Sequence, residues 1–525
     1  MNPVYDVAIV GLGPSGIVAA GLLGQAGLTV FGCDRLADVY EIPRAISLDH
    51  EIQRVFQHLG VMPEVAPFCE PFTPSEYLGV DGQLIRRMTM VAPPYPQGHT
   101  PSIVFSQPPV ERALRARVAQ LPNVTLALQT EMVAVHQDAE AVTLQLRHAD
   151  GSARQVRARY VVACDGGSSP VRTQLGIALE DLDFDEPWLV VDVRVNARGL
   201  AKLPPVSVQY CEPERPCTLV IGPGNHRRWE IAINPGEDPR AVATPERTWA
   251  LLSRWLTPQD GELWRQASYR FHALVAERWR VGRVFVAGDA AHMQPPFLGQ
   301  GMCQGVRDVT NLSWKLQAVL RGHVRGAAAE ALLDSYGVER KAHVRELTAR
   351  IKGVGAVICE RDPVRARQRD ARLLAEAGGQ VRDTPRQDIL PRLEGGCLAL
   401  VDHPARGTLF PQARLQTTDG RVALMDDVAG GGWRLVCRRR PGMPIPAGVA
   451  VLALDDAPWR ECDGVLDAWF GQQAVDAALV RPDHYVFGVA ATSAALIDLL
   501  DQFQRQYLHT TTQGDPQCND VDSLV

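Results

Sequence analysis

Apolar runs at the start of the chain alternate with helix-forming segments. Residues 5–10 predict a short strand, residues 17–25 predict a helix that ends at Gly27, and residues 28–31 predict the next strand. Two later apolar runs, 160–163 and 284–287, end in short sequences of aspartate and glycine. Strands and helices that alternate in this way indicate an α/β fold with a parallel sheet.

The pattern changes between residues 181 and 267. Four short apolar runs are separated by proline, glycine and asparagine, which predicts an antiparallel sheet. These runs are residues 188–196, 206–211, 217–222 and 229–234.

A third pattern follows a helical region at 335–352. Segment 378–396 carries glycine pairs at both ends and prolines between them, which is typical of a linker. Beyond it, strands alternate with helices that begin at Gly464 and Ser493. The predicted strands of this region are residues 421–424, 433–437, 449–452 and 485–488.

Length and composition fit a soluble globular protein of several domains. The 525 residues predict about three domains of roughly 150 residues each, and 46% are hydrophobic. A net charge of -6 provides no basic surface, so neither nucleic acid nor a membrane is an expected partner. The 11 cysteines form no C-x-x-C pair, which favours reduced thiols, and no metal site is predicted. Without a signal segment or an uncharged run of ~20 residues, a cytoplasmic location is expected.

A glycine-rich loop, Gly11-Leu12-Gly13-Pro14-Ser15-Gly16, joins the first strand to the first helix. Its glycines permit a tight turn, close approach of a pyrophosphate and close packing of helix on strand. The free N–H groups at the start of the helix suit phosphate. Asp34, followed by Arg35, ends the second strand, where a carboxylate can accept hydrogen bonds from ribose hydroxyls. The sequence therefore predicts a dinucleotide site.

A second anchor for a larger cofactor lies far downstream. Gly288-Asp289 ends the strand at 284–287, and a proline- and glycine-rich loop at 295–301 opens into a helix predicted at 302–320. The Asp289 carboxylate suits a polyhydroxylated chain because it accepts several hydrogen bonds, and the glycines leave room for a flat ring. This pairing indicates FAD. No second glycine fingerprint follows, so a nicotinamide donor is expected to bind only transiently.

The third motif, the strand at 160–163 followed by Cys164-Asp165-Gly166-Gly167, completes a resemblance. In order and separation, the three motifs resemble those of the single-component FAD-dependent aromatic hydroxylases, the p-hydroxybenzoate hydroxylase-like group A monooxygenases. Segments 224–230, 407–412 and 480–486 are similar to the 3-(3-hydroxyphenyl)propionate 2-hydroxylase subgroup. The similarity covers nearly the whole chain.

The resemblance implies a cofactor site for FAD, with NADH or NADPH as co-substrate. Asp289 would hold the ribityl chain, the loop at 295–302 would lie beside the isoalloxazine ring, and Arg44 and Gln107 match residues that bind the cofactor. The FAD would be non-covalent, because no His or Cys stands in a flavin-linking context. The complete set of residues implied is Gly11, Gly13, Pro14, Ser15, Gly16, Asp34, Arg35, Arg44, Gln107, Asp165, Gly166, Gly288, Asp289, Pro296, Gly299, Gln300, Gly301 and Met302.

The resemblance also implies a division into domains. A Rossmann-like FAD-binding domain would comprise 1–70, 106–180 and 268–377, with an inserted antiparallel β-sheet substrate domain at 71–105 and 181–267. The linker at 378–396 would lead to a thioredoxin-like C-terminal domain at 397–525. Without a C-x-x-C pair, that domain is expected to be structural or to support a homodimer.

The implied activity is hydroxylation of a phenolic aromatic substrate, such as a hydroxyphenylpropionate-like acid, with O2 and a flavin C4a-hydroperoxide. Other flavin redox chemistry, a polycyclic or heteroaromatic substrate, and a non-catalytic FAD-binding protein remain open. A halogenase is disfavoured because no two tryptophans form a Trp-x-Trp motif.

No catalytic residue is assigned from the sequence. His50 is a candidate base by its place after Arg44, with a structural histidine at a helix start as the alternative. Arg86, Arg87 and Arg194 are candidate cations for a substrate carboxylate, with surface charges as the alternative. Three downstream polar residues are expected to cap or pack: His292, Asp308 and Asn311.

Overall fold

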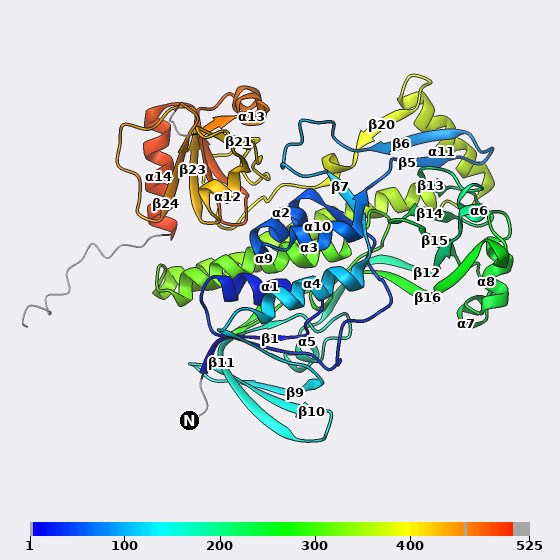
Figure 1. Ribbon diagram of the computed structural model, residues 1–525, viewed down its shortest axis with the longest axis horizontal. Helices are drawn as coiled ribbons and strands as arrows, with labels where there is room; N and C mark the ends of the chain where they lie inside the picture. Colours follow the sequence, from blue (N-terminus) through cyan, green and yellow to red (C-terminus); the bar gives the residue numbers. More distant parts are fainter. Residues whose placement is uncertain (1–3, 456–458, 508–525) are drawn as a thin grey trace, which may run out of the picture.

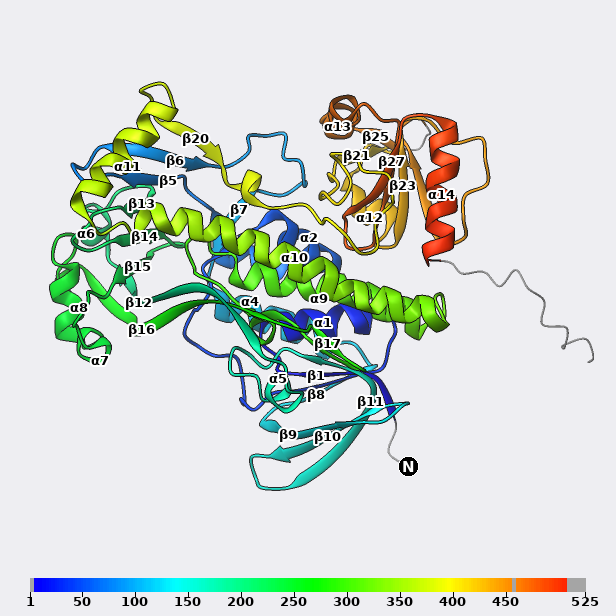
Figure 2. The same ribbon diagram turned by 180° about the vertical axis from the view of Figure 1, so that it is seen from behind.

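Parallel strands form the centre of the sheet that carries the glycine-rich loop (Figures 1 and 2). The computed structural model describes residues 4–455 and 459–507, so the end of the predicted C-terminal domain, 508–525, lies outside the described residues. Along its main path the eight-stranded sheet has the order β17 (Arg280–Val281), β18 (Val284–Val286), β11 (Ala153–Ala163), β1 (Val4–Val10), β2 (Val30–Cys33) and β8 (Val124–Ala127). From β18 to β8 all neighbours are parallel, as predicted. The antiparallel strands β10 (Val142–His148) and β9 (Thr130–Gln137) extend the sheet from β11.

The carboxyl ends of the parallel strands meet at one edge of this sheet. The residues just beyond β1, β2, β11 and β18 all belong to the predicted cofactor site: Gly11, Asp34, Asp165 and Gly288. Ligands of open α/β sheets bind outside the carboxyl ends of the strands. Motifs far apart in the sequence therefore form one cluster in space.

Helices cover one face of the eight-stranded sheet. Helix α1 (Pro14–Gln25) packs against α4 (Gln107–Ala119) and α9 (Gly301–Leu320), and α10 (Gly326–Ile358) packs on α9. Figure 1 shows these helices on one side of the strands and the β9–β10 hairpin on the other. With 33 residues, α10 is about 50 Å long and contacts both the second sheet and the C-terminal domain. In the described part of the chain, no helix combines the length and apolarity needed to cross a bilayer.

The second sheet has nine strands and is mostly antiparallel, as the turn pattern predicts. Its order is β19 (His292–Met293), β16 (Gly261–Ala276), β12 (Leu179–Val195), β15 (His226–Ala232), β14 (Cys217–Ile221), β13 (Ser207–Tyr210), β5 (Ser75–Leu78), β6 (Leu84–Thr89) and β20 (Arg382–Pro385). Its two faces differ. Alternate residues such as Trp229 and Ile231 form an apolar core with helix α8 (Pro245–Leu252), whereas Asp192, Arg228 and Glu230 on the other face are buried and polar.

Segment 378–396, expected to be a linker, supplies the last strand of this sheet. Strand β20 pairs in parallel with β6, and a 3-10 turn at Arg386–Ile389 follows it. The Arg386 guanidinium then donates a hydrogen bond to the carbonyl of Leu298. The chain therefore returns to the second sheet before it enters the C-terminal domain. This strand was not predicted, because it is only four residues long and the glycines and prolines around it are typical of a linker.

The C-terminal domain is built on a four-stranded sheet. Its strand order is β24 (Val449–Ala453), β23 (Trp433–Cys437), β26 (Ala477–Val480) and β27 (Val486–Ala490), with β23 and β24 parallel and the other pairs antiparallel. Beside it lie α12 (Met425–Ala429), α13 (Val465–Gln473), α14 (Ser493–Tyr507) and a small sheet of β21 (Arg414–Thr417), β22 (Val422–Leu424) and β25 (Trp459–Glu461). This arrangement confirms the predicted thioredoxin-like domain and, with the two larger sheets, the predicted α/β fold. Strand β26 was not predicted.

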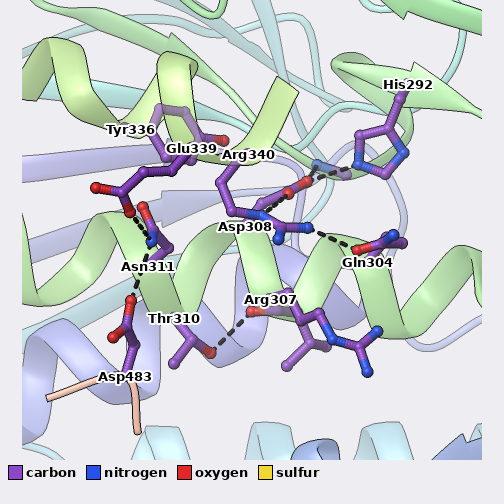
Figure 3. A network of polar contacts seen from close by, with 12 residues as sticks. His292, Gln304, Arg307, Asp308, Thr310, Asn311, Tyr336, Glu339, Arg340 and Asp483 are labelled. Carbon is purple, nitrogen blue, oxygen red and sulfur yellow. Dashed lines mark hydrogen bonds and ion pairs between the residues drawn. The ribbon is translucent and has the colours of Figure 1, made fainter. Parts of the chain in front are cut away.

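The C-terminal domain shares a core with α9 and α10. Trp314 of α9 packs edge-on against Trp433 of β23, with ring centroids 5.7 Å apart. Next to this contact, the fully buried Arg481 donates to Glu339 of α10 at 2.6 Å and to Asp483. Figure 3 shows how Asn311 of α9 bridges Glu339 and Asp483. Apolar packing and buried ion pairs therefore join this domain to the helices of the cofactor sheet.

We expect Arg481→Met to lower the free energy of unfolding by about 3–5 kcal/mol, because two buried carboxylates would lose their shared cation. Urea unfolding measures this loss. The matched control is Arg414→Met, which removes a 2.7 Å ion pair with Asp463 from a side chain that is 55% exposed. That variant should lose less than about 1 kcal/mol. Equal losses in the two variants would contradict a stabilising role of the buried network.

Candidate active site

A cavity of about 690 Å³ begins at the carboxyl edge of the eight-stranded sheet and extends over the polar face of the nine-stranded sheet. Its lining includes residues of every predicted motif. The predicted cofactor residues that line it are Gly11, Gly13, Pro14, Ser15, Asp34, Arg35, Arg44, Gln107, Asp165, Gly166, Asp289, Pro296, Gly299, Gly301 and Met302. Gly16, Gly288 and Gln300 lie behind this lining.

Gly16 and Gly288 allow close backbone packing. A Cβ at Gly16 would overlap the carbonyl oxygen of Gly11, and a Cβ at Gly288 would come within 2.8 Å of Ser15 Oγ. Gly288 also has a φ of +61°, a region that favours glycine. These two glycines therefore allow the loops around the cavity to pack closely.

Other glycines form an open cradle. At Gly13, Gly166 and Gly301 no atom lies within 4 Å of the place where a Cβ would be. Gly13 and Gln300 are the N-caps of α1 and α9, and neither helix start has a side-chain cap. The first-turn N–H groups of both helices are thus available to an anionic or polar ligand.

Two half-buried side chains in the cavity wall carry buried polar atoms without a hydrogen-bond partner. Arg115 donates to the carbonyl of Leu12 at 3.1 Å, but its Nε and Nη1 atoms have no partner among the described residues. Both amide atoms of Gln294 are likewise unpartnered. Since buried polar groups in proteins are nearly always hydrogen-bonded, these atoms indicate a ligand. Neither residue was predicted, because each stands outside the glycine motifs.

Asp289 and Asp308 are close in the fold but differ in their surroundings. Asp289 is exposed to the cavity, and no described residue donates a hydrogen bond to its carboxylate. Asp308 is fully buried and accepts from the Gly288 N–H at 3.0 Å, from His292 Nε2 at 2.7 Å and from Arg340 Nε at 2.9 Å (Figure 3). Asp308 and His292 therefore fix the loop, as expected of packing residues, and leave Asp289 free.

The aspartates at the other strand ends mainly order their own loops. Asp34 accepts from the N–H groups of Leu12 and Leu36 at 2.7 and 2.8 Å. Asp165 accepts from Ser169 Oγ and from the Val171 N–H at 2.5 and 3.0 Å. Each carboxylate keeps lone pairs that a ribose hydroxyl could use. Burial raises the pKa of the Asp165 carboxyl group.

The side chains of Gln107 and Gln300 form hydrogen bonds with other segments of the protein. The Gln107 carbonyl oxygen accepts from the N–H groups of Arg44 and Ala45, at 2.8 and 2.6 Å, so it fixes the segment that carries Arg44. The Gln300 carbonyl oxygen accepts from Arg307 at 2.9 Å. Arg307 in turn donates to Glu51 at 2.6 Å. The loop before α9 is thus tied to α2 (His50–Leu59).

The far end of the cavity has aromatic walls and a charged floor. The aromatic residues of this part are Phe72, Tyr269, Phe271 and Phe297. Arg228 lines this floor, and behind it Asp192 pairs with both Arg228 and His226, each at 2.7 Å. Burial opposes the ionisation of Asp192, but Arg228 and His226 outweigh it and hold the pKa at about 2. Arg228 and Arg265 also donate to the carbonyl of Pro43, which joins this floor to the segment before Arg44.

Glu230 and Arg386 also line the cavity, and neither was assigned to the site from the sequence. Burial raises the pKa of Glu230 to about 7, and no described residue donates a hydrogen bond to its carboxylate. Arg386 stacks on Phe72 at 4.4 Å and has no carboxylate within ion-pair distance in the described chain. The sequence carried a signal for Glu230: polar residues 228 and 230 alternate with apolar 229 and 231 along one strand.

The cations and the base suggested from the sequence lie elsewhere. Arg86 packs over Tyr77, Arg87 pairs with Glu76, and Arg194 packs over Trp264, so none of the three lines the cavity. His50 is also outside the cavity lining. It starts α2 in a buried position, and that burial lowers its pKa to about 4. His50 is therefore a structural histidine at a helix start, and the three arginines are charges outside the cavity.

Residues 4–351 match the family described as FAD binding domain. The chain is 37% identical over 518 residues to a probable NADH-specific resorcinol 4-hydroxylase of Rhodococcus jostii (strain RHA1), covering 94% of this chain and 93% of that protein. The chain belongs to the family of FAD-dependent aromatic hydroxylases. It is also 34% identical over 523 residues to a 3-(3-hydroxy-phenyl)propionate/3-hydroxycinnamic acid hydroxylase of Burkholderia cenocepacia (strain HI2424), covering 93% and 94%.

The solved structures agree with this family. A ternary complex of aklavinone-11 hydroxylase with FAD and aklavinone is similar with a TM-score of 0.79 and 25% identity, covering 97% of this chain and 100% of that one. The cofactor of this hydroxylase is FAD, and the glycine cradle, the uncapped helix starts and the unpartnered Arg115 and Gln294 fit it. The resemblance found in the sequence is confirmed.

We expect Asp289→Ala to weaken FAD retention about tenfold to a hundredfold while the protein remains folded. The lost charge-assisted hydrogen bonds, about 1.5–3 kcal/mol each, would serve the cofactor and not the core. Equilibrium dialysis of the flavin measures the effect. Asp498→Ala, which removes an exposed carboxylate from α14, is the control. Unchanged FAD affinity in the Asp289 variant would reject this role.

Proposed function

We propose that this hydroxylase uses NADH or NADPH and O2 to hydroxylate a phenolic ring, ortho to an existing hydroxyl group. The observation that carries the proposal is the cavity itself. It joins a cofactor cradle at the strand ends to a chamber with aromatic walls and charged side chains. The described residues form no second dinucleotide-binding sheet. An aromatic-lined cavity with a few convergent polar groups suits a small aromatic substrate.

The proposed roles in cofactor binding follow from position. The loop from Gly11 to Gly16 and the start of α1 hold the pyrophosphate, and Asp34 with Arg35 faces the adenosine ribose. Asp289 holds the ribityl chain. The loop from Pro296 to Met302 and the start of α9 border the flavin ring, where free N–H groups stabilise negative charge. When bound, reduced FAD activates O2 and supplies the oxygen atom that enters the ring.

The proposed substrate is a hydroxyphenylpropionate-like phenolic acid. Arg386 supports an acid, because its guanidinium lies in the chamber, pairs with no carboxylate of the described residues, and can form a charge-assisted hydrogen bond. A neutral dihydroxybenzene is the second candidate, because the relative at 37% identity is named as a resorcinol 4-hydroxylase. In either case Phe72, Phe271 and Phe297 would contact the ring and exclude water.

Isotope incorporation tests the reaction. Phenolic acids and dihydroxybenzenes should accelerate NADH or NADPH oxidation, and one atom from 18O2 should appear in a catechol-type product. The same assay without O2 separates flavin reduction from oxygen transfer. If the new oxygen came from water, or if no phenol accelerated NADH or NADPH oxidation, the proposed function would fail.

Arg386→Met should raise the KM of a phenolic acid about tenfold or more and leave the KM of resorcinol within about threefold. The physical reason is the loss of a charge-assisted hydrogen bond to the carboxylate, worth about 1.5–3 kcal/mol. Arg382→Met, an exposed position on β20, is the matched control. An equal change of KM for both substrates would mean that Arg386 does not recognise a carboxylate.

A further inference from the structure

Glu230 lies at the centre of the polar face of the nine-stranded sheet. On β15 its neighbours Trp229 and Ile231 enter the apolar core on the opposite face, so Glu230 points to the cavity side. It pairs with Val190 on β12 and with Thr218 on β14, and all three residues line the cavity. Its position is therefore set by a strand with partners on both sides.

Glu230 and the nearby Asp192 differ in their hydrogen-bond partners. Asp192 is fully buried and is satisfied by His226 and Arg228. Glu230 is only 7% exposed, yet no described residue donates a hydrogen bond to its carboxylate. A buried carboxylate without partners is costly, so this group is suited to a hydrogen-bond donor that arrives with the ligand.

We propose that Glu230 accepts the hydroxyl hydrogen of the aromatic substrate and takes up that proton as the ring is hydroxylated. The inference rests on the proposed function and names the group that activates the phenol. The substrate O–H bond breaks, a carboxyl O–H bond forms, and the electron pair left on oxygen enriches the ring. When the hydroxylated ring releases its C–H proton to water and regains aromaticity, Glu230 returns its own proton to the same oxygen. Reduced FAD and O2 supply the oxygen atom, as in the proposed function.

The surroundings of Glu230 bring its pKa into the range that suits a base. Burial is the main cause that raises its pKa to about 7, Arg228 and Arg265 oppose the rise, and Asp192 adds to it. The next two strands on one side of β15, β14 and β13, contribute Thr218 and Gln209, which do not titrate and hydrogen-bond to each other at 2.5 Å. A base with a pKa near the working pH is the most effective. Below pH 7 the carboxyl is protonated, so the hydroxylation rate should fall as pH falls through this value.

Two substitutions separate proton transfer from binding. Glu230→Gln can still accept a hydrogen bond but cannot take a proton. It should lower kcat about a hundredfold, remove the inflection near pH 7, and change KM less than tenfold. Glu230→Asp should keep the inflection. The matched control is Glu262→Gln, an exposed carboxylate on β16 of the same sheet, which should leave the pH profile unchanged.

A binding measurement needs no turnover. Spectral titration of the oxidised, FAD-loaded protein gives the Kd of a phenol and of its methyl ether, which has no O–H to donate. The wild type should prefer the phenol, and Glu230→Leu should remove most of that preference. Thermal unfolding at pH 8 checks the fold. Glu230→Gln should be no less stable than wild type, because above pH 7 the native state carries the cost of an ionised, buried Glu230.

The proposal is overturned if Glu230→Gln keeps kcat within threefold and retains the inflection, or if Glu230→Leu retains the full preference for the phenol. A failure of the proposed function looks different. In that case the wild type itself would show no phenol-dependent oxidation of NADH or NADPH, while the binding titration would still test Glu230.

Discussion

Close backbone packing at one edge of the eight-stranded sheet is the constraint on which the site depends. The loop after β1 lies against the end of β11, and a Cβ at Gly11 would overlap the Cys164 carbonyl. The Ser15 side chain occupies the space between Gly288 and Gly305. A side chain at either glycine would displace Ser15. Three strand ends and the start of α9 can meet only because these positions lack side chains. The cofactor cradle is the space that this packing leaves.

Buried charges hold the loops around that cradle. Asp308 receives hydrogen bonds from a backbone N–H, a histidine and an arginine, so the loop carrying Asp289 has one defined position. The Gln300–Arg307–Glu51 chain does the same for the loop before α9. Such networks add little net stability compared with apolar packing, but breaking one of them is costly. Their contribution is to specify geometry.

The C-terminal domain extends this system of buried charges. Tyr485 donates to Glu51 at 3.0 Å, and Arg481 donates to Glu339 of α10. A domain without a C-x-x-C pair thus contacts the same helices that bear the cofactor loop. On the other side, α10 reaches the nine-stranded sheet, where Arg386, the residue after β20, lines the cavity.

The sequence by itself determined the α/β fold, the FAD motifs and the family, because glycine spacing and apolar strands are local patterns with strict backbone requirements. Of the 18 residues that it predicted for the cofactor, 15 line the cavity. It did not identify Glu230, Arg386 or Arg115, and it suggested His50, Arg86, Arg87 and Arg194 instead. The role of a charged side chain depends on which partners surround it, and those partners come from strands and loops far apart in the chain. Only the tertiary structure decided that Asp192 is satisfied and that Glu230 is not.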